Sequence, residues 1–285
     1  MALTHTYLIN GSFDQTISPL DRGFAYGDGV FRTMVMRNGV PDSWPFHYQK
    51  LVADCGAIGI VCPSAELLMS DLQQLFSPDE IAVAKIIVTR GEGERGYTPP
   101  AITTPMRVII KSAMPNYAAV NYTKGVHLHV CETRLAHQPK LAGIKHLNRL
   151  ENVMARMEWR DEALFDGLML DQEDNVIECT MSNIFARFDG KLITPDLSQC
   201  GVAGITRQRI IELANSPRLT KSPGVTSILG LTVEVAQLPL SLLLQADEVI
   251  ICNSLYGAFQ VNTIANKTWS QQPLASTIRN LLTHD

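Results

Sequence analysis

The segment that most constrains the fold is a glycine-rich run, Gly91-Glu-Gly93-Glu-Arg-Gly96, which leads directly into Tyr97-Thr-Pro-Pro100. The run reads Gly-x-Gly-x-x-Gly after a predicted strand, so it matches a dinucleotide-binding fingerprint. That fingerprint works only where a helix begins and offers its amides to a pyrophosphate, and the two prolines exclude such a helix start. We therefore predict a functional loop over residues 91–105 that presents Arg95 to a ligand carboxylate, and no dinucleotide site.

The residues on either side of this loop predict a small domain of sheet and helices over residues 1–115. A strand over 7–11 enters an Asn-Gly turn, and a strand over 30–36 is followed by Asn38-Gly39. Helices are predicted over 46–58 and 64–76, the second capped by Ser64, and strands over 81–89 and 106–111.

Periodicity is lost around residues 113–125, so we predict a linker at 116–124 and a second, larger domain at 125–285. Strands are predicted at 126–132, 167–171, 176–178, 183–188, 191–194, 231–235 and 247–252, and helices at 147–159, 205–214, 239–245 and 273–282. Two domains agree with 285 residues at about 150 per domain. The predicted fold class is mixed α/β, of the α+β kind.

Charge and composition exclude several classes of protein. The chain has 24 basic and 28 acidic residues and no basic run, which argues against binding to nucleic acid. It has neither a secretory signal nor an apolar run of the roughly 20 residues that span a bilayer, so we expect a cytoplasmic protein without membrane contact. The six cysteines are scattered, which predicts free thiols, mostly buried.

No motif predicts a metal site, a serine hydrolase or a P-loop. His127 and His129 are two residues apart on a predicted strand, and a metal pair could have this spacing. Because no third ligand stands out, we favour a structural or hydrogen-bonded role for both histidines.

Three features remain, and together they describe a cofactor site. Gly204-Ile-Thr206 opens a helix whose amides, with a threonine hydroxyl, can bind a phosphate monoester. Lys145 lies on an apolar segment, where burial favours a neutral amine, and Glu178 ends a short strand, where a buried carboxylate needs a cationic partner. Taken alone, the first is more often an ordinary helix start, and an isolated lysine is nearly always solvated.

A Schiff-base lysine, a carboxylate for a ring nitrogen and a helix start for a phosphate are what pyridoxal 5′-phosphate (PLP) requires. Five segments in order carry a resemblance over nearly the whole chain: Asp21-Arg-Gly-Phe-Ala-Tyr-Gly-Asp-Gly29, Gly143-Ile-Lys145, the segment from Glu178 to Asn183-Ile-Phe185, Gly204-Ile-Thr-Arg207 and Ala246-Asp-Glu-Val-Ile-Ile-Cys-Asn-Ser254. At these segments the chain resembles the fold-type IV, or class IV aminotransferase, family of PLP enzymes.

The resemblance implies a two-domain fold like that of D-amino acid aminotransferase, with a C-terminal pseudo-barrel and PLP in the cleft between the domains. It implies that Lys145 is the Schiff base and general acid/base and that Glu178 faces the ring nitrogen. The other cofactor-binding residues that it implies are Asn183, Gly204, Ile205, Thr206, Ser254 and Lys50. At Lys50 the family usually has an arginine that holds the phosphate, and lysine keeps the charge but loses the bidentate fork.

The family resemblance also implies a homodimer. Only 18% of the residues are charged, against about 25% in typical proteins, and surface covered between subunits would account for the difference.

Within the family, two segments are similar to the 4-amino-4-deoxychorismate lyases: Lys145-His-Leu-Asn-Arg-Leu-Glu151 and Gly93-Glu-Arg-Gly-Tyr97. This similarity implies cleavage of aminodeoxychorismate to 4-aminobenzoate and pyruvate in folate synthesis. D-amino acid aminotransferases have a tyrosine at the position of Phe31, whose ring cannot replace that hydroxyl. The implied substrate-binding residues are Arg95, Tyr97, Phe31 and Thr33.

Two alternatives stay open. An aminotransferase for D- or branched-chain amino acids keeps the same lysine and glutamate but consumes 2-oxoglutarate. A non-catalytic PLP-binding protein could use the same fold, because fold alone does not prove function.

Overall fold

The computed structural model describes residues 6–215 and 232–283. The chain divides into two compact units, which are described separately here. The first unit contains Met1–Asn116 and Ile144–Asn148, and the second contains Tyr117–Gly143 and Arg149–Asp285. The segment that carries Lys145 therefore belongs to the first unit, although most of the chain around it belongs to the second.

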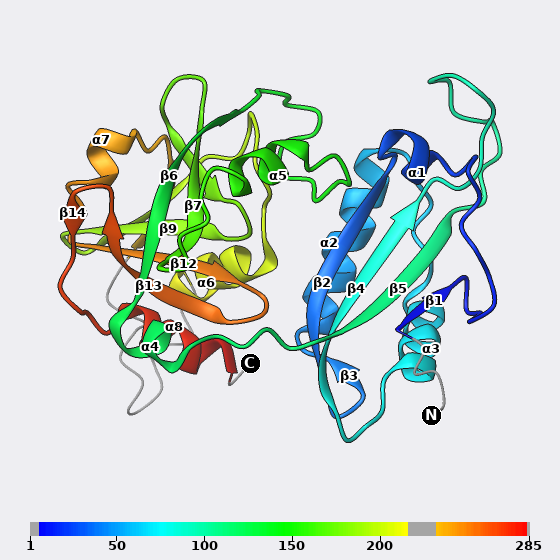
Figure 1. The fold of residues 1–285 in the computed structure, drawn as a ribbon, viewed down its shortest axis with the longest axis horizontal. Helices are drawn as coiled ribbons and strands as arrows, with labels where there is room; N and C mark the ends of the chain where they lie inside the picture. The colour runs from blue at the N-terminus through cyan, green and yellow to red at the C-terminus, as the bar shows by residue number, and fades with distance from the viewer. Residues whose placement is uncertain (1–5, 216–231, 284–285) are drawn as a thin grey trace. The chain divides into compact units, whose positions relative to one another are not determined.

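The first unit is built on a five-stranded antiparallel sheet (Figure 1) in the order β1-β5-β4-β2-β3. Its strands are β1 (Tyr7–Ile9), β2 (Gly29–Arg37), β3 (Val40–Pro41), β4 (Ile81–Thr89) and β5 (Met106–Ala113). The predicted turn at Asn38-Gly39 is confirmed, since both residues have positive φ and join β2 to β3. Strand β1 pairs with β5, however, and not with a neighbour in sequence.

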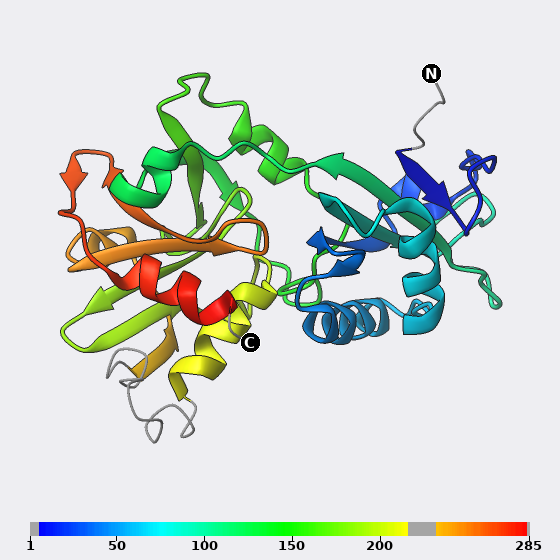
Figure 2. The same ribbon diagram turned by 90° about the horizontal axis from the view of Figure 1, so that it is seen from below.

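Helices α2 (Trp44–Ala57) and α3 (Ala65–Leu75) cover one face of this sheet (Figure 2). Leu51, Leu68 and Leu72 pack against Met34 and other buried residues of the strands. The predicted cap is confirmed, because the Ser64 hydroxyl accepts a hydrogen bond from the Leu67 amide at 3.2 Å. A short helix, α1 (Arg22–Tyr26), was not predicted.

The second unit contains a curled nine-stranded mixed sheet in the order β11-β10-β9-β12-β13-β6-β7-β8, with β14 paired to β13. Its strands are β6 (Val126–Leu135), β7 (Leu164–Asp171), β8 (Val176–Cys179), β9 (Asn183–Phe188), β10 (Lys191–Pro195), β11 (Thr232–Ala236), β12 (Glu248–Asn253), β13 (Gly257–Ile264) and β14 (Lys267–Thr268). Strand β13 was not predicted. The mixed α/β fold class is confirmed.

The helices of the second unit are α4 (Ala119–Lys124), α5 (Leu150–Arg156), α6 (Ile205–Asn215), α7 (Leu240–Leu243) and α8 (Leu274–Thr283). Helices α6 and α8 lie side by side on the sheet (Figure 2), where Ile210, Leu274 and Ile278 share a buried cluster with Phe185. Helix α4 lies within the predicted linker, and the predicted strand start at residue 231 lies outside the described residues.

The helix predicted over 147–159 was wrong at its start. Its first residues are not helical, and the Leu147 amide donates to the Gly29 carbonyl of β2 at 3.0 Å. The helix is α5, which begins at Leu150. Pairing with a strand edge, which no local sequence pattern encodes, therefore outweighs the helical periodicity of these residues.

All six cysteines are free, and five of them are buried, which confirms the prediction for the thiols. Among the described residues, no helix is long and apolar enough to cross a membrane. No group of histidine, cysteine and acidic side chains in residues 6–215 and 232–283 could hold a metal ion.

Candidate active site

The N-terminus of α6 brings several polar groups together in the second unit. The first amides of an α-helix have no acceptor within the helix, so those of Ile205 and Thr206 can bind an anion. The Thr206 hydroxyl lies 3.4 Å from the hydroxyl of Ser254, which follows β12. Two hydroxyls therefore accompany the amides at this helix start.

Asn183 shapes the loop that precedes α6. Its side-chain oxygen accepts from the Gly204 amide at 3.1 Å, and its nitrogen donates to the Val202 carbonyl at 2.8 Å. A Cβ atom on Gly204 would lie 2.3 Å from that oxygen, so only glycine fits. Asn183 thus fixes the backbone conformation of the loop that leads into α6.

Glu178 is at the end of β8 and is only 3% exposed. Its Oε2 atom accepts a hydrogen bond from the Val202 amide at 2.8 Å. Burial lowers the pKa of Arg149, and attraction to Glu178 opposes that shift, so an arginine lies within electrostatic reach of the carboxylate. A buried carboxylate in such surroundings can hold a protonated ring nitrogen.

Lys145 is positioned by backbone bonds within the first unit. Its carbonyl accepts from the Phe31 amide at 2.9 Å, and its amide donates to Asp54 Oδ2 at 3.2 Å. The neighbouring His146 forms a bridge with Val30. The Nζ atom of Lys145 lies 4.7 Å from the centre of the Phe31 ring. Lys145 and Phe31, two predicted site residues, are therefore in contact.

A cluster of buried charged side chains beside Lys145 was not predicted from the sequence. Asp54, on α2, forms ion pairs with Arg32 of β2 and with Lys50, and both Asp54 and Arg32 are almost fully buried. Burial and the positive charges of Arg32 and Lys145 lower the pKa of Lys50 to about 7. Two cations share one carboxylate here, so the cluster favours an anionic ligand. The i, i+4 spacing of Lys50 and Asp54 was the available sequence signal.

Phe31 and Thr33 alternate along β2 and lie on the opposite face of the sheet from Arg32. Lys85 of β4 stands opposite Thr33, and its ammonium nitrogen is also 4.7 Å from the Phe31 ring centre. Burial lowers the pKa of Lys85. Lys85 is a second polar residue of this face that the sequence did not single out.

The loop over residues 91–105 carries Arg95 and Tyr97, as predicted. Both side chains are exposed, Tyr97 at 86%. Arg95 forms no ion pair with any residue in the described part of the chain. The loop backbone, in contrast, is tied to α1 by several hydrogen bonds.

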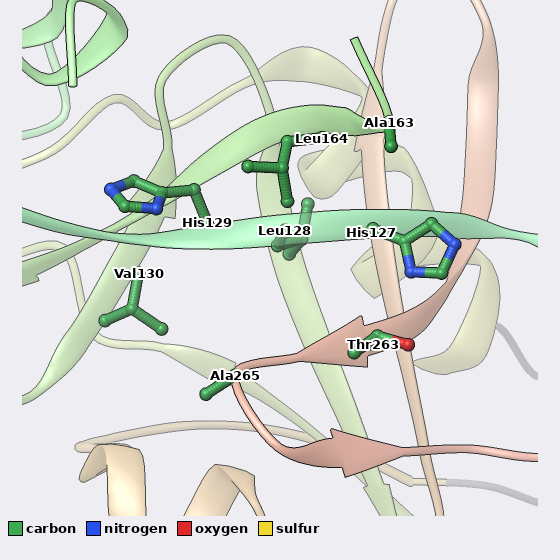
Figure 3. A pocket seen from close by; sticks show the side chains of 8 residues that line it. All are labelled: His127, Leu128, His129, Val130, Ala163, Leu164, Thr263 and Ala265. Atoms are coloured by element: carbon green, nitrogen blue, oxygen red, sulfur yellow. The ribbon is translucent and has the colours of Figure 1, made fainter. Parts of the chain in front are cut away.

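His127 and His129 line a pocket of about 470 Å³ at β6, together with Leu164 and Thr263 (Figure 3). His129 Nε2 lies 3.1 Å from Glu158 Oε2, and its ring is 5.3 Å from that of Trp159. The hydrogen-bonded interpretation is thus confirmed for His129.

Comparison with known proteins gives consistent matches over the chain. The family model for amino-transferase class IV matches residues 29–264. The aminodeoxychorismate lyase of Vibrio harveyi is 37% identical over 260 residues, or 91% of each chain. The crystal structure of 4-amino-4-deoxychorismate lyase from Pseudomonas aeruginosa is 39% identical with a TM-score of 0.88 over 98% of each chain. A hypothetical aminotransferase from Mycobacterium tuberculosis, PLP-bound form, covers 94% of this chain and 92% of its own at 19% identity and a TM-score of 0.75, and so shows the shared fold alone.

Proposed function

The chain belongs to the class IV aminotransferase family, and we propose that it is a PLP-dependent lyase that converts 4-amino-4-deoxychorismate to 4-aminobenzoate and pyruvate in folate synthesis. The observation that carries this proposal is agreement with two lyases above 35% identity, each over more than nine-tenths of both chains. Phe31 supports it, because this position lacks the hydroxyl with which D-amino acid aminotransferases bind a substrate carboxylate.

The residues present fit PLP by their chemistry. The second unit offers amides and hydroxyls at Ile205, Thr206 and Ser254 for the phosphate, with Gly204 and Asn183 shaping the approach. Its buried Glu178 suits a protonated pyridine nitrogen. The first unit offers Lys145 for the aldehyde and Lys50 as a further cation for the phosphate. When bound, PLP supplies an electron sink for the electrons left by proton loss.

Lys145 performs the proton transfers in this proposal. Its ε-amino group takes the proton from C4 of the substrate ring, the bond between C3 and the enolpyruvyl oxygen breaks, and Lys145 returns a proton to the departing enolpyruvate, which becomes pyruvate. Aromatisation of the substrate ring drives the release of pyruvate. Phe31 places an apolar ring face beside the amine, and the backbone bonds of Lys145 to Phe31 and Asp54 fix where the side chain starts.

In this proposal Arg95, Tyr97, Phe31 and Thr33 bind the substrate. Replacing Arg95 with alanine removes a bidentate partner for a substrate carboxylate, so we expect KM to rise at least about tenfold. Cofactor content and kcat stay near those of the wild type, because the contact is with substrate. Steady-state kinetics measure KM and kcat, and the visible spectrum measures the cofactor content. Arg37→Ala, at an exposed ion pair with Asp42, is the matched control; an unchanged KM for the Arg95 variant excludes this role.

Lys50 makes cofactor affinity dependent on pH. Its pKa is lowered to about 7, so the ammonium loses its proton as pH rises through 7 and not near 10.5. The attraction of Lys50 for a phosphate is therefore present below pH 7 and lost above it. We compare the dissociation constant of PLP for the wild-type protein with that for Lys50→Arg. We expect the ratio of the two constants, wild type to variant, to increase about tenfold between pH 6 and 8.5. Titrations of the apo-protein measure it, and equal pH profiles for the two proteins would contradict the assignment.

One assay separates the proposed activity from its alternatives. Purified protein is incubated with aminodeoxychorismate, and 4-aminobenzoate is measured beside amino transfer from D- and branched-chain amino acids to 2-oxoglutarate. The lyase releases 4-aminobenzoate without a keto acid. Transfer alone supports an aminotransferase, and a visible cofactor spectrum with neither activity supports a PLP-binding protein.

A homodimer is part of the proposal, and helix α5 supports it. Leu150, Val153, Met154 and Met157 recur at the spacing of one helical face, and each is at least half exposed. An apolar face of this kind commonly marks a surface that another protein covers. Light scattering of the purified protein tests this assembly.

We also place the protein in the cytoplasm. Six free cysteines, with no disulfide among them, suit a reducing compartment. The substrate is a small molecule, and neither nucleic acid nor membrane takes part in the proposed reaction.

A further inference from the structure

Arg22, the first residue of α1, is buried, whereas Arg95 and Tyr97 in the loop over residues 91–105 are exposed. The guanidinium donates from Nη1 to the Gly96 carbonyl and from Nη2 to the Tyr97 carbonyl, both at 3.0 Å. Its Nε donates to Asp28 Oδ2 at 2.9 Å. All three guanidinium nitrogens are thus engaged, two of them with the carbonyls of the two residues that directly follow Arg95.

Asp28 is itself held from the other side by Arg90. The Arg90 guanidinium donates to both Asp28 oxygens, at 2.7 and 2.9 Å, and to the carbonyls of Ile58 and Gly59. Burial raises the pKa of Asp28, but the hydrogen bonds and charges of Arg90 and Arg22 outweigh it and hold the pKa below its usual value. Asp28 is therefore an ionised anchor that fixes the orientation of Arg22.

Tyr26, one helical turn after Arg22, binds Gly96 as well, at its amide. Its hydroxyl accepts from the Gly96 amide at 3.1 Å, while the Gly96 carbonyl is bound by Arg22. The centre of the Tyr26 ring lies 5.5 Å from the centre of the Tyr97 ring and 5.1 Å from the Arg22 guanidinium. Gly96 is thus held at both its amide and its carbonyl.

The base of the loop approaches α1 closely enough to require glycine. The Arg22 amide donates to the Gly91 carbonyl at 2.8 Å, and the Gly93 amide donates to the Leu20 carbonyl at 3.1 Å. A Cβ atom on Gly93 would lie 2.9 Å from Cδ of Arg22. Gly93 of the glycine-rich run therefore leaves the room that the Arg22 side chain occupies.

We propose that Arg22 is a positioning residue for substrate recognition. It holds the loop over residues 91–105 in its binding conformation through its hydrogen bonds to the Gly96 and Tyr97 carbonyls. The inference rests on the proposed substrate-binding role of Arg95. A planar guanidinium fork suits two adjacent carbonyls, and an ammonium cannot reproduce this geometry. Arg22 does not touch the substrate in this proposal and acts through the position of Arg95.

Limited trypsin digestion tests the tether without any activity measurement. Trypsin cuts after arginine, so cleavage of the Arg95–Gly96 bond reports how often the loop is released. We expect Arg22→Met to speed this cleavage at least about tenfold relative to the other tryptic sites, and Tyr26→Phe to speed it less. Arg37→Met, at an exposed arginine of β2, leaves the rate unchanged. Using the ratio to other sites removes the effect of global destabilisation.

Kinetics distinguish positioning from a purely structural role. Arg22→Met should raise KM about as much as Arg95→Ala, with kcat and cofactor content near those of the wild type. Because both substitutions remove the same interaction, the double variant should be no worse than Arg95→Ala alone. Arg22→Lys, which keeps one donor, should be intermediate and serves where the methionine variant folds poorly.

Two results overturn the proposal. One is cleavage after Arg95 within twofold of wild type, relative to other sites, in both Arg22 variants. The other is a loss of kcat or of cofactor at unchanged KM, which would give Arg22 a structural role. If the wild-type protein releases no 4-aminobenzoate, the proposed function fails, while the trypsin experiment still decides whether Arg22 holds the loop.

Discussion

Lys145→Ala is expected to lower turnover by at least about 10³-fold and to remove the visible absorbance of the bound cofactor. The ε-amine is the group that holds the cofactor aldehyde and moves both protons in the proposed reaction, and alanine offers no substitute. The fold should survive, because the bonds that seat this segment on β2 come from backbone atoms of residue 145 and its neighbours. Spectroscopy, 4-aminobenzoate release and a thermal melt measure the three effects.

Lys85→Ala is the matched control for the spectrum. The Nζ atoms of Lys85 and Lys145 lie at the same distance, 4.7 Å, from the Phe31 ring centre. Removing Lys85 changes the charge near the same ring but should leave the visible absorbance in place. Residual turnover near the wild-type level in Lys145→Ala, or loss of absorbance in Lys85→Ala alone, would reassign the cofactor lysine.

The parts of the fold that could be predicted are those with local chemical causes. Ser64 caps α3 through its own hydroxyl, and Asn38-Gly39 supplies the positive φ values that the turn between β2 and β3 needs. Pairing between distant strands has no such local cause. Strand β1 pairs with β5, about a hundred residues later, and Leu147 leaves its helical pattern to bond β2.

The candidate site shows the same division. Lys145, Glu178 and the Gly204–Thr206 helix start stand in recognisable segments, so resemblance could identify them. Arg32 and Asp54 carry no motif of their own, and Arg22 lies in a segment of the resemblance that assigned it no role. Each acquires its significance from a partner on another element, such as the Arg32–Asp54 pair between β2 and α2 or the Arg22 bonds to the loop at residues 96 and 97. Within the glycine-rich run, the structure explains Gly93 through the close approach of the Arg22 side chain.

Asp54→Asn is expected to destabilise the protein by about 3–5 kcal/mol at pH 6, where Lys50 is largely protonated. The substitution leaves Arg32 and Lys50 without their carboxylate, and Arg32 is too deeply buried for water to replace it. Asparagine is similar in size, so the loss comes from charge and not from a cavity. Urea unfolding of the apo-protein measures the free energy directly.

A double variant shows whether the charge is the cause. Arg32→Met removes the most deeply buried cation, so in the Asp54→Asn background it should restore most of the lost stability, since replacing a whole buried pair by an apolar residue is often neutral. Asp42→Asn, which breaks the exposed pair with Arg37, should cost no more than about 1 kcal/mol. If Asp54→Asn costs as little as this control, or if Arg32→Met adds a further loss, Asp54 does not act as the counter-ion. Asp54 also accepts the Lys145 amide, so restored stability without restored turnover would separate its contribution to the fold from its contribution to placing Lys145.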